Sequence, residues 1–257
     1  SFYFLGILWT LDSATRIAQP GRKPRRRLWL ELGLAIGVTA LLRQLVLLFV
    51  PFLALWVWWN LEPPDKPADG AAWLPRWANW PAIQGLLVSG LVVAALIAPW
   101  TLRNYRAFGT FVPLNTNAGF AFYWGNHPIH GTHFMPLLPL DGPSYQDLIP
   151  AQLLPLNEGQ LDRALLQAGI GFVVDDPLRY LQLSWSRIPE YVKFWPSPDS
   201  GLISNVSRVA SFGLLLPFML YGLWLAARRL RAPDHPAQRA QIVLLYLFMA
   251  VYPLLHL

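Results

Sequence analysis

Residues 28–60 read LWLELGLAIGVTALLRQLVLLFVPFLALWVWWN, an apolar stretch that is interrupted near its middle by Arg43 and Gln44. The stretch is too long for one membrane-spanning helix, which needs about 20 residues. An arginine at the centre of a bilayer costs at least about 3 kcal/mol. Two shorter helices, 28–42 and 45–60, avoid that cost if the chain turns at Arg43. Residues 28–60 are therefore predicted to form a helical hairpin.

The composition is that of a chain whose solvent is partly lipid. Of its 257 residues, 54% are hydrophobic and 13% are charged, whereas soluble domains carry about 25% charged residues. Tryptophan, which suits the membrane–water boundary, occurs 13 times, and cysteine is absent. Further apolar segments run over 2–11, 82–100, 209–227 and 240–257. We therefore predict an all-α multi-pass protein of the cell (plasma or inner) membrane, with no disulfide framework.

Two basic clusters predict the orientation of these helices. One comprises Arg16, Arg22, Lys23, Arg25, Arg26 and Arg27, and the other comprises Arg228, Arg229, Arg231 and Arg239. A nucleic-acid surface is the alternative, but both clusters border apolar runs. This placement is typical of the Lys and Arg excess on the cytoplasmic side of membrane helices. We therefore predict membrane lipid, and no nucleic acid, as a partner.

Counting crossings from these clusters divides the chain into three parts. Residues 1–100 are predicted to be transmembrane helices with a cytoplasmic loop at 12–27 and the hairpin turn near Arg43. Residues 101–208 then lie outside the cytoplasm. Residues 209–257 form two transmembrane helices joined by a cytoplasmic loop at 228–239. A single span at 28–60 would instead place the second basic loop outside, against the charge rule.

The extracytoplasmic segment is expected to be mixed but mainly helical. Its first part, 101–156, contains scattered Pro and Gly and is interpreted as strand and loop. Asn157 and Gln160 resemble a capping box that opens a helix over 157–174. Asp176-Pro177 opens a second helix over 176–188. The side of that helix formed by Leu181, Trp185 and Ile188 is predicted to lie against the membrane surface or the transmembrane helices.

Three histidines with the spacing H-x2-H-x2-H, His127, His130 and His133, are the only metal-site pattern in the sequence. A zinc site is one interpretation, and ordinary polar loop residues are the other. No helix places all three on one face, so we predict no metal. The chain begins with Ser1 and ends at Leu257 inside apolar runs, and we expect it to be a portion of a longer protein.

Several stretches resemble one family. They are GLAIGVTALLRQ at 33–44, PWTLRNYRAFG at 99–109, NTNAGF at 115–120 and WGNHP at 124–128. Together with the helices from Asn157 to Trp195, they resemble GT-C type membrane glycosyltransferases, in particular the bacterial protein-mannosyltransferase and aminoarabinose-transferase relatives. The resemblance covers most of the chain and implies a GT-C-like architecture.

The resemblance also implies an activity. Such enzymes transfer a sugar from a polyprenyl-phosphate donor to an acceptor at the outer membrane face, without a nucleotide-sugar donor or a cofactor. Many relatives carry the catalytic carboxylate in an outer loop near the amino terminus. No part of this sequence matches that motif, so the catalytic residue stays unassigned.

Candidate binding residues follow from the chemistry of this donor. A guanidinium keeps its charge and binds phosphate oxygens in pairs, so Arg43, Arg103 and Arg106 are candidate ligands of the donor phosphate. Snorkelling to lipid headgroups is the alternative role for each arginine. The candidates for binding the sugar or acceptor are Asn115, Asn117, Trp124 and Asn126. The asparagines serve equally well as turn residues, and the indole serves equally well as packing at the interface.

Two other functions compete with glycosyl transfer. The chain suits a non-catalytic subunit of a larger membrane protein complex, with other membrane subunits as partners. A transporter or a lipid-linked ligase is the third hypothesis. Transporters place ionisable residues near the middle of the bilayer. The predicted spans contain almost none apart from Arg43, which disfavours that function.

Overall fold

The chain is described here from a computed structural model. The residues that it describes are 2–19, 24–61, 79–135, 138, 142–197, 200–231 and 236–255. Within these ranges the secondary structure is helical and no strand occurs, which confirms the predicted helical class. The interpretation of 101–156 as partly strand was wrong for the described residues.

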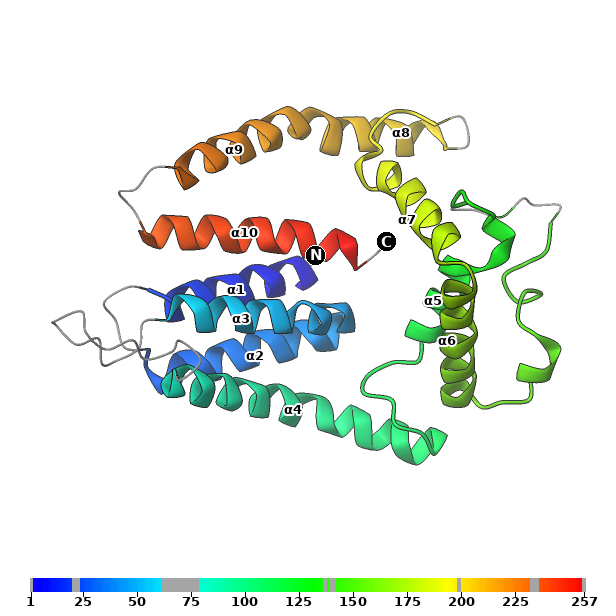
Figure 1. The fold of residues 1–257 in the computed structure, drawn as a ribbon, viewed down its shortest axis with the longest axis horizontal. Helices are drawn as coiled ribbons and strands as arrows, with labels where there is room; N and C mark the ends of the chain where they lie inside the picture. The colour runs from blue at the N-terminus through cyan, green and yellow to red at the C-terminus, as the bar shows by residue number, and fades with distance from the viewer. Residues whose placement is uncertain are drawn as a thin grey trace, which may run out of the picture.

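A bundle of roughly parallel and antiparallel helices forms one part of the molecule (Figure 1). Its members are α1 (Phe2–Ile17), α2 (Arg26–Leu42), α3 (Val50–Asn60), α4 (Trp80–Phe108) and α10 (Pro236–Leu254). The end at which α2 gives way to α3 is called the turn end. The opposite end, at which α1, α3 and α9 (Leu214–Leu230) finish and α2, α4 and α10 begin, is called the basic end.

The hairpin residues fold as two helices with a break at Arg43. This residue has an extended backbone with φ −158° and ψ 112°, and its N–H donates to the Thr39 carbonyl at 2.9 Å. A short 3-10 helix, Gln44–Leu48, precedes α3. The sequence interpretation had one helix over 45–60, but Pro51 lacks an N–H and cannot donate a bond back to Leu47. The α-helix therefore starts only at Val50.

Glycines let α2 and α4 approach closely. A Cβ atom on Gly33 would lie 2.6 Å from the Ser89 carbonyl oxygen, and one on Gly37 would lie 2.5 Å from a Leu96 methyl carbon. The Ser89 hydroxyl donates to the Trp29 carbonyl at 2.7 Å, which binds the same two helices. Small residues at such spacing are typical of helix pairs in membranes.

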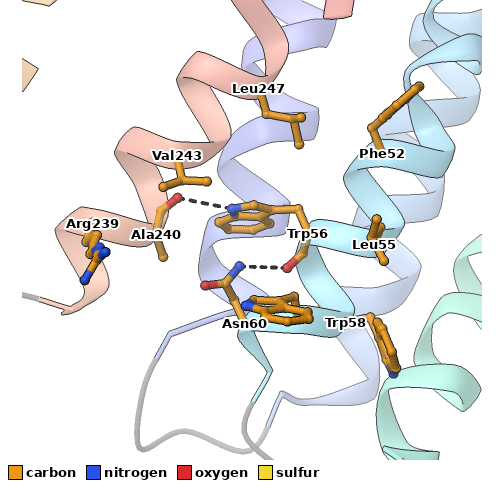
Figure 2. Close-up of a pocket in the computed structure, with 10 residues that line it drawn as sticks. Phe52, Leu55, Trp56, Trp58, Asn60, Arg239, Ala240, Val243 and Leu247 are labelled. Carbon is orange, nitrogen blue, oxygen red and sulfur yellow. Dashed lines mark hydrogen bonds between the residues drawn. The ribbon is translucent and has the colours of Figure 1, made fainter. Parts of the chain in front are cut away.

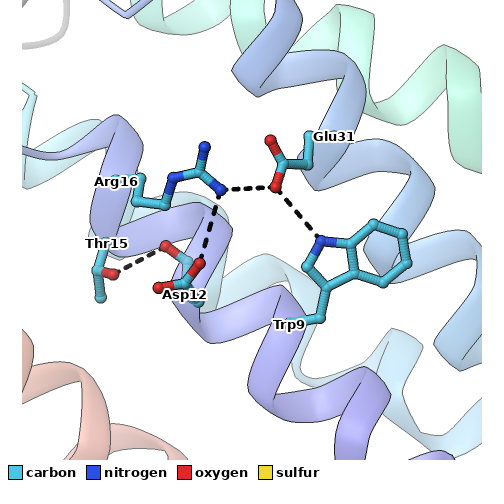
Figure 3. Close-up of polar contacts among 5 residues, drawn as sticks. All are labelled: Trp9, Asp12, Thr15, Arg16 and Glu31. Carbon is cyan, nitrogen blue, oxygen red and sulfur yellow. Dashed lines mark hydrogen bonds and ion pairs between the residues drawn. The ribbon is translucent and has the colours of Figure 1, made fainter.

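A polar network joins α1 to α2 near the basic end (Figure 3). Arg16 Nη1 lies 2.7 Å from Glu31 Oε1 and 3.7 Å from the Asp12 carboxylate. The Trp9 indole N–H donates to the same Glu31 oxygen at 3.4 Å. Glu31 is the carboxylate that interrupts the apolar face of α2. The network gives it a cationic and a hydrogen-bonding partner, so its charge is not left unpaired among apolar side chains.

The chain leaves the turn end of the bundle through α4, which is longer than the predicted span 82–100. Pro99 lies inside the helix, which continues to Phe108. A proline removes one backbone hydrogen bond and does not by itself end a helix. Gly109 ends α4 with a left-handed backbone, φ 66°, and its N–H donates to Tyr105, as is typical of helix C-termini.

Further helices pack beyond the turn end of the bundle (Figure 1). They are α5 (Ala118–Asn126), α6 (Glu158–Asp175) and α7 (Pro177–Val192), with short 3-10 turns at Pro128–His130 and Ala151–Leu153. The predicted capping box of α6 is confirmed, because Asn157 accepts from the Gln160 N–H at 2.9 Å and Gln160 accepts from the Asn157 N–H at 3.3 Å. Asp176 caps α7 by accepting from the Arg179 N–H at 2.9 Å.

The chain returns along a long helical segment that comprises α8 (Leu202–Arg208), a π-helical turn at Val209–Gly213, and α9. Two helices of 29 residues, Trp80–Phe108 and Leu202–Leu230, are long and apolar enough to cross a membrane. The helices at both ends of the chain also exceed their predicted bounds. Because α1 reaches Ile17 and α10 starts at Pro236, parts of the predicted loops 12–27 and 228–239 are helical.

Replacing Gly33 with alanine tests the close contact between α2 and α4. Its Cβ would collide with the backbone of Ser89, so the helices must separate. We expect Gly33→Ala to lower stability by about 1–3 kcal/mol. Gly90→Ala is the matched control, because a Cβ there meets nothing within 4 Å. Unfolding of the two purified variants in detergent measures the effect, and equal stability would contradict the proposed contact.

Candidate functional site

The turn at Arg43 presents a cation at one end of the bundle. The Arg43 side chain is exposed, and its guanidinium carbon lies 6.0 Å from the centre of the Tyr3 ring in α1. The Tyr3 hydroxyl shares a 2.8 Å hydrogen bond with the hydroxyl of Tyr252 in α10. The first and last helices of the described chain therefore meet beside Arg43.

Arg103 lies near the C-terminal end of α4, at the same end of the bundle as Arg43. Its Nη1 donates to the side-chain oxygen of Asn104 at 3.1 Å. Asn104 is 2% exposed, and its Nδ2 donates to the carbonyls of Val112 and Leu114, at 3.2 and 2.8 Å. Asn104 thus folds the segment after Gly109 back along α4. Arg106, one turn further on α4, is exposed.

The folded-back segment connects Arg103 with the hairpin turn. The Asn115 N–H donates to Gln44 Oε1 at 3.4 Å. Leu114 packs against an apolar cluster of Ala40, Val46 and Ile97, which belong to α2, the 3-10 turn and α4. A continuous path of contacts therefore runs from the turn to the end of α4. The residues Arg43, Gln44, Arg103, Asn104 and Asn115 are called the Arg43–Arg103 site.

Two carboxylates of α6 hold the start of α5 and the segment that leads to it. Asp162 of α6 accepts from the backbone N–H groups of Gly119 and Phe120, at 2.8 and 3.2 Å. A carboxylate at a helix N-terminus is favourable because the N–H groups there carry partial positive charge. Burial raises the pKa of Asp162, while the two N–H bonds oppose that shift. Glu158 accepts from the Thr116 hydroxyl. Asn117 precedes α5 at its N-cap position without a capping side-chain bond.

The end of α5 is held by two arginines of α7. Arg179 donates to the Asn126 carbonyl at 2.7 Å, and Arg187 donates to the Gly125 carbonyl. Cations suit a helix C-terminus, where the carbonyl groups carry partial negative charge. Arg187 is 7% exposed, and burial lowers the pKa of its guanidinium. The charges of α6 and α7 thus complement both ends of α5.

The region where the end of α5 meets Arg179 and Arg187 of α7 is called the α5–α7 joint. Trp124 and Asn126 lie in it. The Trp124 ring packs edge-on against Tyr145 and His130, with centroids 4.0 and 4.9 Å apart. Asn126 is 2% exposed and donates to the Phe122 carbonyl at 2.9 Å. Among the described residues, no hydrogen bond or ring contact links either side chain to the Arg43–Arg103 site. The hydrogen bonds and ring contacts of the described residues thus join Asn115, but not these two candidates, to that site.

The histidines are engaged in local bonds. His130 Nε2 lies 3.0 Å from the Trp124 carbonyl, and its Nδ1 accepts from the Met135 N–H at 3.3 Å. These partners match a neutral ring that carries its proton on Nε2. His127 Nδ1 accepts from the Ile129 N–H at 3.1 Å. Within the described ranges, no three His, Cys, Asp or Glu side chains are grouped so that they could hold a metal ion.

Sequence reasoning did not identify the residues that organise these two regions. Asp162, Arg179 and Arg187 bond to backbone atoms distant in the sequence, and Asn104 bonds to carbonyls 8 and 10 residues away. Such partners leave no local pattern. Comparisons with family models, with curated proteins and with solved structures found no match. The geometry of the site therefore carries the functional argument.

The α5–α7 joint should weaken in acid. Burial lowers the pKa of His130 below its ordinary value of 6.5, and the nearby Arg187 adds to that shift. The unfolded state therefore binds a proton more readily, so the contribution of neutral His130 is complete above pH 6.5 and is lost as the pH falls below it.

Hydrogen exchange of residues 118–135, corrected for the intrinsic effect of pH, measures this loss between pH 7.5 and 5. We expect faster exchange at pH 5 in the unmodified protein and a smaller difference between the two pH values in His130→Gln. His133→Gln is the control, since His133 is exposed. The same pH dependence in His130→Gln and in the unmodified protein would contradict this role.

Proposed function

We propose that the chain crosses a membrane several times, with the turn end and α5–α7 outside the cytoplasm. Two observations support this. The helices Trp80–Phe108 and Leu202–Leu230 are long and apolar enough to span, and Arg16, Arg26, Arg228 and Arg239 gather at the basic end. Cytoplasmic ends of membrane helices carry such an excess. The remaining bundle helices run alongside the two long ones (Figure 1).

The helix α7 suits a position against the outer membrane surface. Leu178, Leu181 and Trp185 are 65%, 62% and 76% exposed, and their spacing places them on one side of the helix. Leu183 and Arg187 are buried on the opposite side. An amphipathic helix of this kind lies in the plane of the interface with its apolar side in lipid.

Within that arrangement, we propose that the protein transfers a sugar from a polyprenyl-phosphate donor, as the sequence resemblance suggests. The observation that supports this best is the path from Gln44 through Asn115 to Asn104. This path groups two exposed arginines, Arg43 and Arg103, at the level where a lipid-linked phosphate would sit. The polyprenyl chain stays in lipid, so its phosphate must bind at the membrane boundary.

In the proposed reaction, Arg43 and Arg103 bind the phosphate that departs as the leaving group. The acceptor attacks the anomeric carbon of the sugar, the bond from that carbon to the phosphate oxygen breaks, and the phosphate leaves with the electron pair. Negative charge on the phosphate grows in the transition state, where fixed guanidinium groups stabilise it. The acceptor proton requires a base. We assign none, because Asp162 and Glu158 are engaged in holding α5 and its approach.

The remaining candidate binding residues have less direct roles in the proposed reaction. Asn115 bonds to Gln44, the neighbour of Arg43, and is the candidate for a sugar hydroxyl, with Asn117 two residues further. Arg106 is exposed on the same helix end and offers a second phosphate contact. The side chain of Asn126 is buried and the ring of Trp124 is packed against other rings. Both are therefore better suited to stabilising this region than to binding a ligand directly.

Labelling single cysteines tests the orientation, and these 257 residues contain no native cysteine that would be labelled as well. Gln146 lies beyond the turn end, and Arg229 lies in the last turn of α9 at the basic end; both are exposed. We expect a membrane-impermeant maleimide added to intact cells to label Gln146→Cys and not Arg229→Cys. Membrane lysis should expose both. The opposite pattern would refute the orientation.

Replacing the two arginines tests the donor site. Arg43→Ala and Arg103→Ala in the full-length protein should each lower kcat/KM for the polyprenyl-phosphate donor about tenfold or more, as expected for a lost charged hydrogen bond. Arg43→Lys should restore activity only in part, because lysine lacks the planar fork. Arg163→Ala, an exposed change on α6, is the control. Unchanged turnover in both alanine variants would dismiss the site.

A further inference from the structure

An apolar groove opens between α3 and α10 at the basic end, away from the Arg43–Arg103 site (Figure 2). Its volume is about 630 Å³, within the range of about 300–1,000 Å³ that is usual for small-molecule sites. Trp56 forms its floor and is 5% exposed. The indole N–H donates to the Ala240 carbonyl at 3.2 Å, so the floor presents only the apolar ring to a ligand.

The walls of the groove are apolar and open. Leu55 and Val243 line opposite sides and are 56% and 42% exposed. Leu247 extends the wall along α10 toward the turn end. In water such a surface would be costly, so the groove suits an apolar chain that lies along the two helices.

Polar groups gather at one end of the groove only. Asn60 and Arg239 line it there, and Asn60 is held by donating its side-chain N–H to the Trp56 carbonyl at 2.8 Å. The Arg239 side chain is exposed, and within the described part of the chain no acidic side chain lies within salt-bridge distance of it. Arg228 and Arg229 in the last turn of α9 add positive charge at the same end of the molecule.

We propose that this groove binds an anionic phospholipid, with one acyl chain over Trp56 and the phosphate at Arg239. An apolar slot with a cation at one end matches an amphiphile whose single charged group lies at the membrane boundary. The surrounding positive charge favours an anionic headgroup over a zwitterionic one. The inference rests on the membrane placement proposed above and is independent of glycosyl transfer. The site faces the cytoplasmic leaflet, opposite to the donor site.

Native mass spectrometry of the full-length protein in detergent tests the site directly. The protein is titrated with phosphatidylglycerol and, separately, with phosphatidylcholine. We expect one phosphatidylglycerol to bind about tenfold more tightly than phosphatidylcholine. Arg239→Gln should abolish that preference. Val243→Trp should fill the groove and weaken both lipids. Arg239→Lys should keep part of the preference, which would show that the charge, and not a folding defect, is responsible.

Arg229→Gln is the matched control, since it removes a charge at the same end but does not line the groove. We expect it to keep most of the preference for phosphatidylglycerol, because Arg229 adds only to the general positive charge of this end and does not contact the lipid. Equal retention of both lipids by the unmodified protein, or an unchanged preference in Arg239→Gln, would overturn the site. Displacement of the lipid by free glycerol phosphate would show that the headgroup alone is bound and would overturn the acyl-chain part. Normal lipid binding by Arg43→Ala that lacks turnover would separate this site from the proposed donor site.

Discussion

The close approach of α2 and α4 is the contact on which the rest of the arrangement depends. Gly33 and Gly37 have no side chains that would hold α4 away from α2, so the Ser89 hydroxyl reaches the Trp29 carbonyl. Moving α4 outward by the width of one methyl group would also move Asn104 and the segment that it holds. The position of Arg103 relative to Arg43 is therefore decided by packing far inside the bundle, where neither arginine makes a contact.

Asn104 transmits that packing to the proposed donor site. A buried amide with two carbonyl partners has little freedom, and its third bond, from Arg103, orients a guanidinium that is otherwise exposed. Preorganised cations stabilise developing charge better than mobile ones, because no reorganisation is needed at the moment of reaction. Beyond the turn end, α5 is likewise held in place by charges of α6 and α7 that match its two ends.

Local signals in the sequence predicted much of the helical pattern. The polar pair Arg43-Gln44 marked the break in a long apolar run, and Asn157 with Gln160 marked the start of α6. The predicted span 82–100 was too short, because the apolar run stops at Trp100 whereas the helix continues through more polar residues to Phe108. Asn104 gave no signal, since its burial depends on a segment that folds back over it. The role of Asn126 likewise depends on Arg179 of α7, 53 residues away in the chain, and that of Trp124 depends on Tyr145.

The hydrogen bond between Tyr3 and Tyr252 has a consequence for the order of assembly. Its partners are 249 residues apart, and such distant contacts form late because they require the whole intervening chain. During synthesis α1, α2 and α4 are complete long before α10 emerges. The Tyr3 ring beside Arg43 therefore lacks its Tyr252 partner until α10 has been made. The surface proposed to bind the donor is therefore complete only after α10 has been made, so chains that stop before α10 do not present it in its final form.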